Sequence, residues 1–315
     1  MSLLFKAIYL MTCFYLSNFI IKVAQADIVV VAYDNFSNKG FDLEVIDKHI
    51  KLLNNKKYYV LSTNTIIDAI SSAKILPNYS VAITITSNKK QIINNIWPSM
   101  ATASLPFTLF IEPHLIDNGI NNMQWEDIKT LHNNGVEIGI SSTPKNIVSA
   151  IKLYKNNLSL DPISYQYKLG IWSKEEMQIL KENKIKIAFG DNSGPVSLRM
   201  NIYKLPRFNI SGKFSNIERL KIVLETLPLE VSKVLPETNT LISNPPLYGF
   251  TLLHKDQNPK CYTNNNNEAE VITVNDNRIE VRTKKFNASK ARINCISKNS
   301  NGRLLWHGSL FWVKK

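Results

Sequence analysis

Two apolar stretches of the sequence end abruptly in small polar residues, as strands do where they reach an active-site mouth. The stretches read VAITITSN, at 81–88, and VEIGISSTPK, at 136–145. The polar side chains at their ends are Thr86, Ser87, Ser141 and Lys145. Hydroxyl and ammonium groups bring no negative charge at neutral pH, so they are weak ligands for a divalent cation and poor general bases. These residue types therefore argue against metal-assisted hydrolysis at these two ends.

Other charged side chains also follow apolar runs and could line a ligand groove. Glu112 and His114 come just after the run 107–111, although a surface loop explains both more simply. Asp34 ends the first apolar run, and Arg207 lies in the tetrapeptide LPRF near a predicted strand end. This arginine could face a ligand or form a salt bridge inside the rim of a barrel. None of the histidines forms an H-x₃-H pair, which a metal site on a helix would need.

The sequence contains no further catalytic signature. Neither a Ser-His-Asp arrangement nor a Cys-His arrangement is indicated by a local motif. Trp125 and Trp172 could stack on a sugar ring, but residues at helical positions more often fill a core. Trp306 and Trp312 alternate with polar neighbours near the end of the chain, and they could form a carbohydrate platform or fill a small β core.

The elements that position these residues are predicted from hydrophobic periodicity. Seven apolar runs recur between Asp27 and Val231, at 28–33, 58–62, 81–86, 107–111, 136–141, 163–167 and 185–190. Runs that are apolar at nearly every position are typical of parallel strands buried on both faces. Amphipathic helical patterns fill the gaps, two of them opened by S-x-x-E capping boxes at 173–176 and 215–218. The pattern predicts an α/β fold, either a barrel or an open doubly wound sheet, and no Gly-rich phosphate loop is present.

Composition changes after Glu237, where helical periodicity stops. The Pro-rich passage 243–249 leads into five strand-like segments, which predict a small all-β module over residues 244–315. Cys261 and Cys295 both fall in this module, and in an oxidising compartment we expect them to pair as a disulfide. Two free thiols are the alternative.

The first 26 residues are typical of a signal peptide. Lys6 precedes an apolar run, and Ala24-Gln25-Ala26 supplies the small residues that a signal peptidase accepts. We therefore expect cleavage after Ala26 and export to the periplasm or the medium, and the mature chain has no later transmembrane segment.

The formal net charge is +13, and only Lys6 and Lys22 would leave with the signal. An exported basic protein is expected to meet anionic envelope polymers or lipid head groups, and not nucleic acid. The excess of Lys and Asn is explained equally well by drift in an AT-rich genome.

The order of these segments resembles the NodB-type polysaccharide deacetylases, a carbohydrate esterase family. The resemblance rests on VAIT, PFTLF, the W-x-x-I helix, GVEIG and LPRFNI, and it extends from about Asp27 to Val231. It implies a distorted (β/α) barrel over residues 27–236. It also implies metal-dependent removal of N-acetyl groups from amino-sugar polymers, with zinc or another divalent cation as the cofactor.

The functional positions of the family are occupied by other residue types here. Thr86 holds the place of the catalytic base, and the metal-ligand positions are Ser87, Ser141 and Lys145. An aromatic-Pro-aromatic-Gly turn of the family corresponds to residues 165–168, which include Tyr167. Without carboxylate or imidazole at these positions, no metal cofactor is expected.

Three functions are compatible with these residues. The first is an exported, catalytically degenerate protein that binds envelope glycan or amino-sugar oligosaccharides, in a groove near Asp34, Glu112, His114, Tyr167 and Arg207. The second is an active deacetylase, hydrolysing an amide C–N bond, with ligands relocated to His114, Glu112 and Asp34. In the third, the C-terminal module binds a partner and the barrel is a scaffold.

Overall fold

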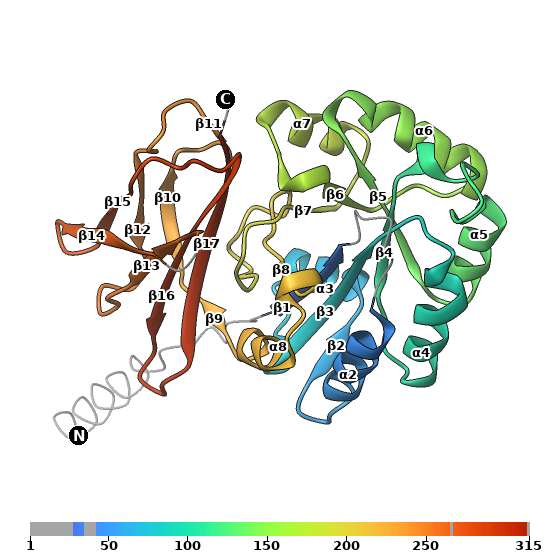
Figure 1. Cartoon of the computed structure of the whole chain (residues 1–315), viewed down its shortest axis with the longest axis horizontal. Helices are drawn as coiled ribbons and strands as arrows, with labels where there is room; N and C mark the ends of the chain where they lie inside the picture. Colours follow the sequence, from blue (N-terminus) through green and yellow to red (C-terminus); the bar gives the residue numbers. More distant parts are fainter. Residues whose placement is uncertain (1–27, 35–41, 265–266, 314–315) are drawn as a thin grey trace, which may run out of the picture.

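The computed structural model of the chain describes residues 28–34, 42–264 and 267–313, and it contains two parts (Figure 1). The first is a curled parallel sheet wrapped by helices, and the second is a β module built on a separate sheet. The expected signal peptide lies outside the described residues. Among the helices that are described, none is both long and apolar enough to cross a bilayer.

All eight strands of the first sheet run parallel, and each of the seven predicted apolar runs forms one of them. The strands are β1 (Ile28–Asp34), β2 (Tyr59–Leu61), β3 (Ser80–Thr86), β4 (Thr108–Ile111), β5 (Glu137–Ser142), β6 (Ser164–Tyr167), β7 (Ile187–Phe189) and β8 (Phe208–Asn209). Their order is β7-β6-β5-β4-β3-β1-β8, and β2 also pairs with β3.

One short segment of chain closes the curl. Leu205 forms a bridge with Phe189 of β7, and Phe208, three residues later, pairs with Val31 of β1. Because the same segment contacts both ends of the sheet, the sheet forms a distorted barrel and not an open doubly wound layer.

The helices follow the strands and cover the outer face of the barrel. They are α2 (Leu43–Leu53), α3 (Thr63–Ser71), α4 (Trp97–Thr102), α5 (Trp125–Asn133), α6 (Ile147–Leu158), α7 (Lys174–Glu182) and α8 (Ile217–Leu224). Ser173 caps α7, as its capping box predicts, by accepting from the backbone N–H of Glu176. The cap of α8 is Asn216 instead of the expected Ser215, because the Asn216 side chain accepts from the N–H groups of the first turn.

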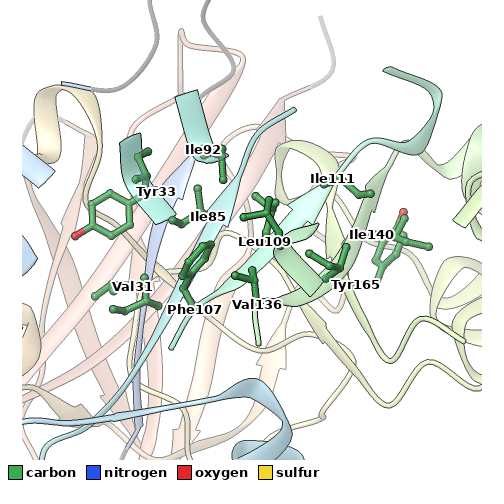
Figure 2. Packing of buried hydrophobic residues seen from close by; sticks show 14 of the residues in the cluster. Val31, Tyr33, Ile85, Ile92, Phe107, Leu109, Ile111, Val136, Ile140 and Tyr165 are labelled. Carbon is green, nitrogen blue, oxygen red and sulfur yellow. The ribbon is translucent and has the colours of Figure 1, made fainter. Parts of the chain in front are cut away.

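Strand residues alternate between two hydrophobic layers. Outward-facing side chains pack under the helices, and Figure 2 shows Val31, Ile85, Leu109 and Ile140 of this layer on β1, β3, β4 and β5. A second cluster fills the inside of the barrel, with Val30, Ala82, Phe110 and Phe189 among its members. The alternation places Asp34, Thr84 and Thr86 on the inner side, at the carboxyl ends of β1 and β3.

Gly139 of β5 permits the closest approach inside the barrel. A Cβ atom at this position would lie 2.5 Å from Cε1 of Phe110 and 2.5 Å from Oγ of Ser164. The glycine of the GVEIG stretch is therefore required by packing against the strands on both sides.

The second sheet is mixed, and within the residues that the structure describes it contains nine strands. They are β9 (Leu227–Pro228), β10 (Val231–Leu235), β11 (Thr240–Leu241), β12 (Tyr248–Leu252), β13 (Lys260–Thr263), β14 (Glu268–Val274), β15 (Arg278–Arg282), β16 (Lys290–Lys298) and β17 (Leu304–Val313). The five strand-like segments predicted from the sequence all form strands here. The first two strands, β9 and β10, come from residues that the sequence pattern placed in the barrel region.

A disulfide joins Cys261 on β13 to Cys295 on β16, as expected from the sequence. The two residues face each other in the antiparallel register of these neighbouring strands, and both are completely buried. The predicted pairing is confirmed, and it holds the core of the β module together.

The β module docks against the barrel through the loop that follows β7. Asn192 accepts from the backbone N–H of Leu310, and Ser193 donates to Asn294 Oδ1 at 2.5 Å. The Trp306 ring packs edge-on against Phe208, with 5.4 Å between the ring centroids. The two parts are therefore joined by both polar and aromatic contacts.

Candidate functional site

The candidate site lies at the carboxyl edge of the first sheet, where β/α barrels carry their catalytic residues. Thr86 is the last residue of β3, and Ser87 follows it. Ser141 lies near the end of β5, two strands away in the sheet. Lys145 lies in the loop that follows β5, and its side chain is exposed.

Thr86 is hydrogen-bonded to a carboxylate on the neighbouring strand. Its hydroxyl donates to Oδ1 of Asp34 at 2.7 Å, and the two residues are direct partners in the parallel register of β1 and β3. The Thr86 side chain is buried, so its hydroxyl is a fixed donor to Asp34.

Arg207 lies inside the barrel beneath this pair. It is 1% exposed, and its guanidinium donates to both Asp34 oxygens at 3.4 Å. Closer bonds run to Oδ1 of Asp191 at 2.8 Å, to the Gly190 carbonyl at 3.1 Å and to the Thr84 hydroxyl at 3.2 Å. Of the two alternatives open from the sequence, a ligand contact or a salt bridge inside the rim, the geometry corresponds to the second.

The two carboxylates around Arg207 respond differently to burial. Desolvation raises the pKa of Asp34, and the attraction of Arg207 offsets this only in part. Desolvation also acts on Asp191, but Arg207, Lys290 and Arg292 together outweigh it and lower the pKa of Asp191. Asp191 is therefore the main counter-ion of the guanidinium, and Asp34 is the more easily protonated of the two.

The hydroxyls of Ser141 and Ser87 also have hydrogen-bond partners within the protein. Ser141 donates to Oε1 of Gln166 at 2.5 Å, and the Gln166 amide donates onward to the Tyr167 carbonyl. Ser87 accepts from the backbone N–H of Lys89 at 3.1 Å, which holds the turn after β3.

An ion pair spans the mouth above these residues. Lys168, just after β6, lies 2.5 Å from Oε2 of Glu112, just after β4. Since β5 lies between β4 and β6, the pair crosses the end of the strand that carries Ser141.

The residues proposed as relocated metal ligands have separate partners. Asp34 binds Thr86 and Arg207, Glu112 binds Lys168, and the exposed His114 lies 3.0 Å from the Ser149 hydroxyl. Within residues 28–34, 42–264 and 267–313, no group of three or more His, Cys, Asp or Glu side chains is arranged to hold a metal ion.

The donor set at the four family positions does not fit a dication. It consists of three hydroxyls, two of which are donors to carboxylate or amide oxygens, and one exposed ammonium group. A zinc ion in a protein needs imidazole, thiolate or carboxylate ligands, and the nearest carboxylate, Asp34, already faces a guanidinium.

Tyr167 and the tryptophans are mostly structural. Tyr167 is fully buried and its hydroxyl donates to the Tyr203 carbonyl, so it does not line the mouth. Trp125 and Trp172 belong to the outer hydrophobic layer. Trp306 packs on the barrel, and Trp312 donates to the Leu169 carbonyl.

The comparison with solved structures identifies the fold. Neither a scan against protein-family models nor a search of curated proteins gives a match. Among solved structures, the deacetylase PplD from Streptococcus pyogenes, in complex with acetate, superposes with a TM-score of 0.56 at 16% identity, covering 64% of this chain and 98% of the other. IcaB from Ammonifex degensii superposes with a TM-score of 0.53 at 14% identity, covering 63% and 97%. The chain has a polysaccharide deacetylase fold.

A third structure with this deacetylase fold is BC0361, a polysaccharide deacetylase from Bacillus cereus. It superposes with a TM-score of 0.54 at 13% identity, covering 64% of this chain and 69% of that one. At identities this low, the superpositions establish the fold alone. The chemistry has to be argued from the residues present at the mouth of the barrel.

Sequence reasoning missed Asp191, the main counter-ion of Arg207 in the buried network. Asp191 comes just after β7, in the same way that Asp34 lies at the end of β1. The rule that site residues lie at the carboxyl ends of barrel strands could therefore have identified it. His49, on the outer helix α2, is 1% exposed, with Nδ1 beside the Tyr33 hydroxyl and Nε2 beside the Ser215 carbonyl.

Proposed function

We propose that this protein is an exported, catalytically degenerate polysaccharide deacetylase that binds an envelope glycan without deacetylating it. One observation carries the proposal: Asp34 accepts from Thr86 and pairs with Arg207, so the carboxylate nearest the family base position is already engaged. An amino-sugar oligosaccharide is the ligand class, because the structures that share the fold are polysaccharide deacetylases by name.

Hydrolysis of an N-acetyl group needs a polarised carbonyl and a base that activates water. Thr86 cannot supply the base, since its hydroxyl does not titrate in water. A guanidinium within 3.4 Å of Asp34 repels any dication that this carboxylate would otherwise attract. At the remaining ligand position, Lys145 carries an exposed ammonium group, which cannot bind a dication.

Two features support export. The first 26 residues have the composition of a signal peptide, and the disulfide is typical of proteins in oxidising compartments. The high basic charge agrees with a place beside anionic envelope polymers.

The test compares the mature chain with a variant carrying Thr86→Asp, Ser87→Asp, Ser141→His and Lys145→His. Metal content and acetate release from chitooligosaccharides and peptidoglycan are measured for both. We expect no stoichiometric metal and no acetate from the unsubstituted chain, together with retained binding to one of these glycans. Metal-dependent acetate release by the unsubstituted chain would overturn the proposal. Metal binding by the variant would identify these positions as an ancestral site.

A further inference from the structure

A cavity of about 510 Å³ lies between the barrel and the β module, and neither Asp34, Thr86, Asp191 nor Arg207 lines it. Its walls include residues of the segments 172–177, 192–206 and 230–239 and of β17. The volume falls within the range of sites that hold small molecules. Trp172 and Trp306 supply apolar surface, while lysine, histidine and asparagine side chains supply polar groups.

The charges around this cavity are unbalanced. Lys174 pairs with Glu237 at 2.7 Å, and Arg199 pairs more weakly with Glu230 at 3.5 Å. Lys204 differs from both. In the part of the chain that the structure describes, no carboxylate oxygen lies within 4 Å of its ammonium group, which rests 4.7 Å from the centre of the Trp172 ring.

The Lys204 side chain is half-buried, and this burial lowers its pKa, although the charge of Glu237 acts in the opposite direction. A partly buried charge is costly unless an opposite charge accompanies it. Glu237 attracts Lys204 only from beyond ion-pair distance and is already paired with Lys174, so a ligand could add a carboxylate in direct contact with Lys204.

A neutral histidine forms part of the cavity wall. His307 of β17 lines the cavity, and its Nε2 atom is buried without a hydrogen-bond partner. Burial lowers the pKa of His307 to about 4, and the charge of Lys204 acts in the same direction. The ring is thus neutral at physiological pH, and it adds no positive charge to that of Lys204.

We propose that this cavity binds a saccharide that carries a carboxylate, with the carboxylate on the Lys204 ammonium and the sugar ring beside Trp306. One cation without a carboxylate at bonding distance suits a singly charged group. Glu230 and Glu237 in the walls disfavour a phosphate dianion. The proposal does not depend on the glycan binding proposed for the barrel mouth.

The test uses the full mature chain and digalacturonate as the probe. Binding is followed by calorimetry and by tryptophan fluorescence. The controls are the dimethyl ester of digalacturonate, which keeps the rings and removes the charges, and inorganic phosphate. We expect binding of digalacturonate alone, and a loss of roughly tenfold or more in affinity for Lys204→Gln, as for a lost charged hydrogen bond.

Two further variants separate the site from general effects. Lys181→Gln removes a lysine that lies over the Tyr203 ring outside the cavity, and it should leave affinity unchanged. Lys204→Arg keeps the charge and should retain most of the binding. The proposal fails if digalacturonate does not bind, if its ester or phosphate binds as tightly, or if a folded Lys204→Gln variant keeps the affinity. Chitobiose binding that survives Lys204→Gln would belong to the mouth and would bear on the first proposal only.

Discussion

Lys168 and Glu112 approach to 2.5 Å and join the end of β6 to the end of β4, over the strand that separates them. Their side chains are 29% and 21% exposed, so the pair is partly shielded from water. Each side chain neutralises the charge of the other. The pair connects two strand ends at the rim of the barrel, at the place where a ligand would enter.

Removing this pair tests how much the rim contributes to stability. We expect Lys168→Met and Glu112→Gln to show a coupling free energy of about 0.5–1 kcal/mol in a double-mutant cycle, because partly exposed pairs are screened by solvent. Urea unfolding of the two single variants and the double variant gives the value. High salt should reduce it. Strict additivity of the two substitutions would show that the contact contributes nothing.

Arg207→Met should destabilise the barrel far more. The substitution leaves Asp34 and Asp191 buried without their cation, a change that typically costs about 3–5 kcal/mol. Chemical denaturation provides the measurement. Lys48→Met breaks an exposed pair with Glu44 and serves as the control, for which no measurable change is expected. Equal stability of Arg207→Met and the unsubstituted protein would contradict the network described here.

Glu176 predicts a pH dependence of stability. Its side chain is 4% exposed, Oε1 has no hydrogen-bond partner, and burial raises its pKa to about 7. A raised folded-state pKa favours the protonated form, so its contribution is complete below the unfolded-state pKa of about 4.5 and is lost as pH rises through 7. With allowance for solvent screening, we expect a loss of about 2 kcal/mol between pH 5 and pH 8.

The measurement is the free energy of unfolding of the native chain minus that of Glu176→Gln, across this pH range. Because His49 and His307 have lowered pKa values and act in the opposite direction, only the difference between the two proteins isolates Glu176. A flat difference profile would show that Glu176 titrates normally.

Gly308→Ala should weaken the docking of the β module. A Cβ atom at Gly308 would overlap the side chain and the carbonyl oxygen of Ser193, and the backbone oxygen cannot move aside easily. We expect barrel and module to unfold in separate calorimetric transitions in this variant. Gly302→Ala, at a turn with open space around it, is the comparison, although its positive φ adds local strain. A single transition at the original temperature for Gly308→Ala would refute the close approach.

The strands of the barrel were predictable because burial on both faces leaves an apolar run that stands out locally. The side-chain partners were not, because they join residues far apart in the chain. Arg207 meets Asp34 across 173 positions, and only the segment from Leu205 to Phe208 that closes the barrel brings them together. The two-residue strands β9 and β11 have no periodicity to detect. The N-cap of α8 was also not predictable. Ser215 and Asn216 can both cap a helix, and only the backbone geometry shows that Asn216 does so.

The way the chain leaves the barrel has a practical consequence for dissecting the protein. Strands β9 and β10 follow α8 directly and pair with β17 and β12 of the second sheet. A polypeptide cut at residue 243 would keep both strands without neighbours, and unpaired edges of this kind recruit other chains. Ending the polypeptide after Glu225 removes both strands, and is the cleaner way to ask what the barrel does by itself.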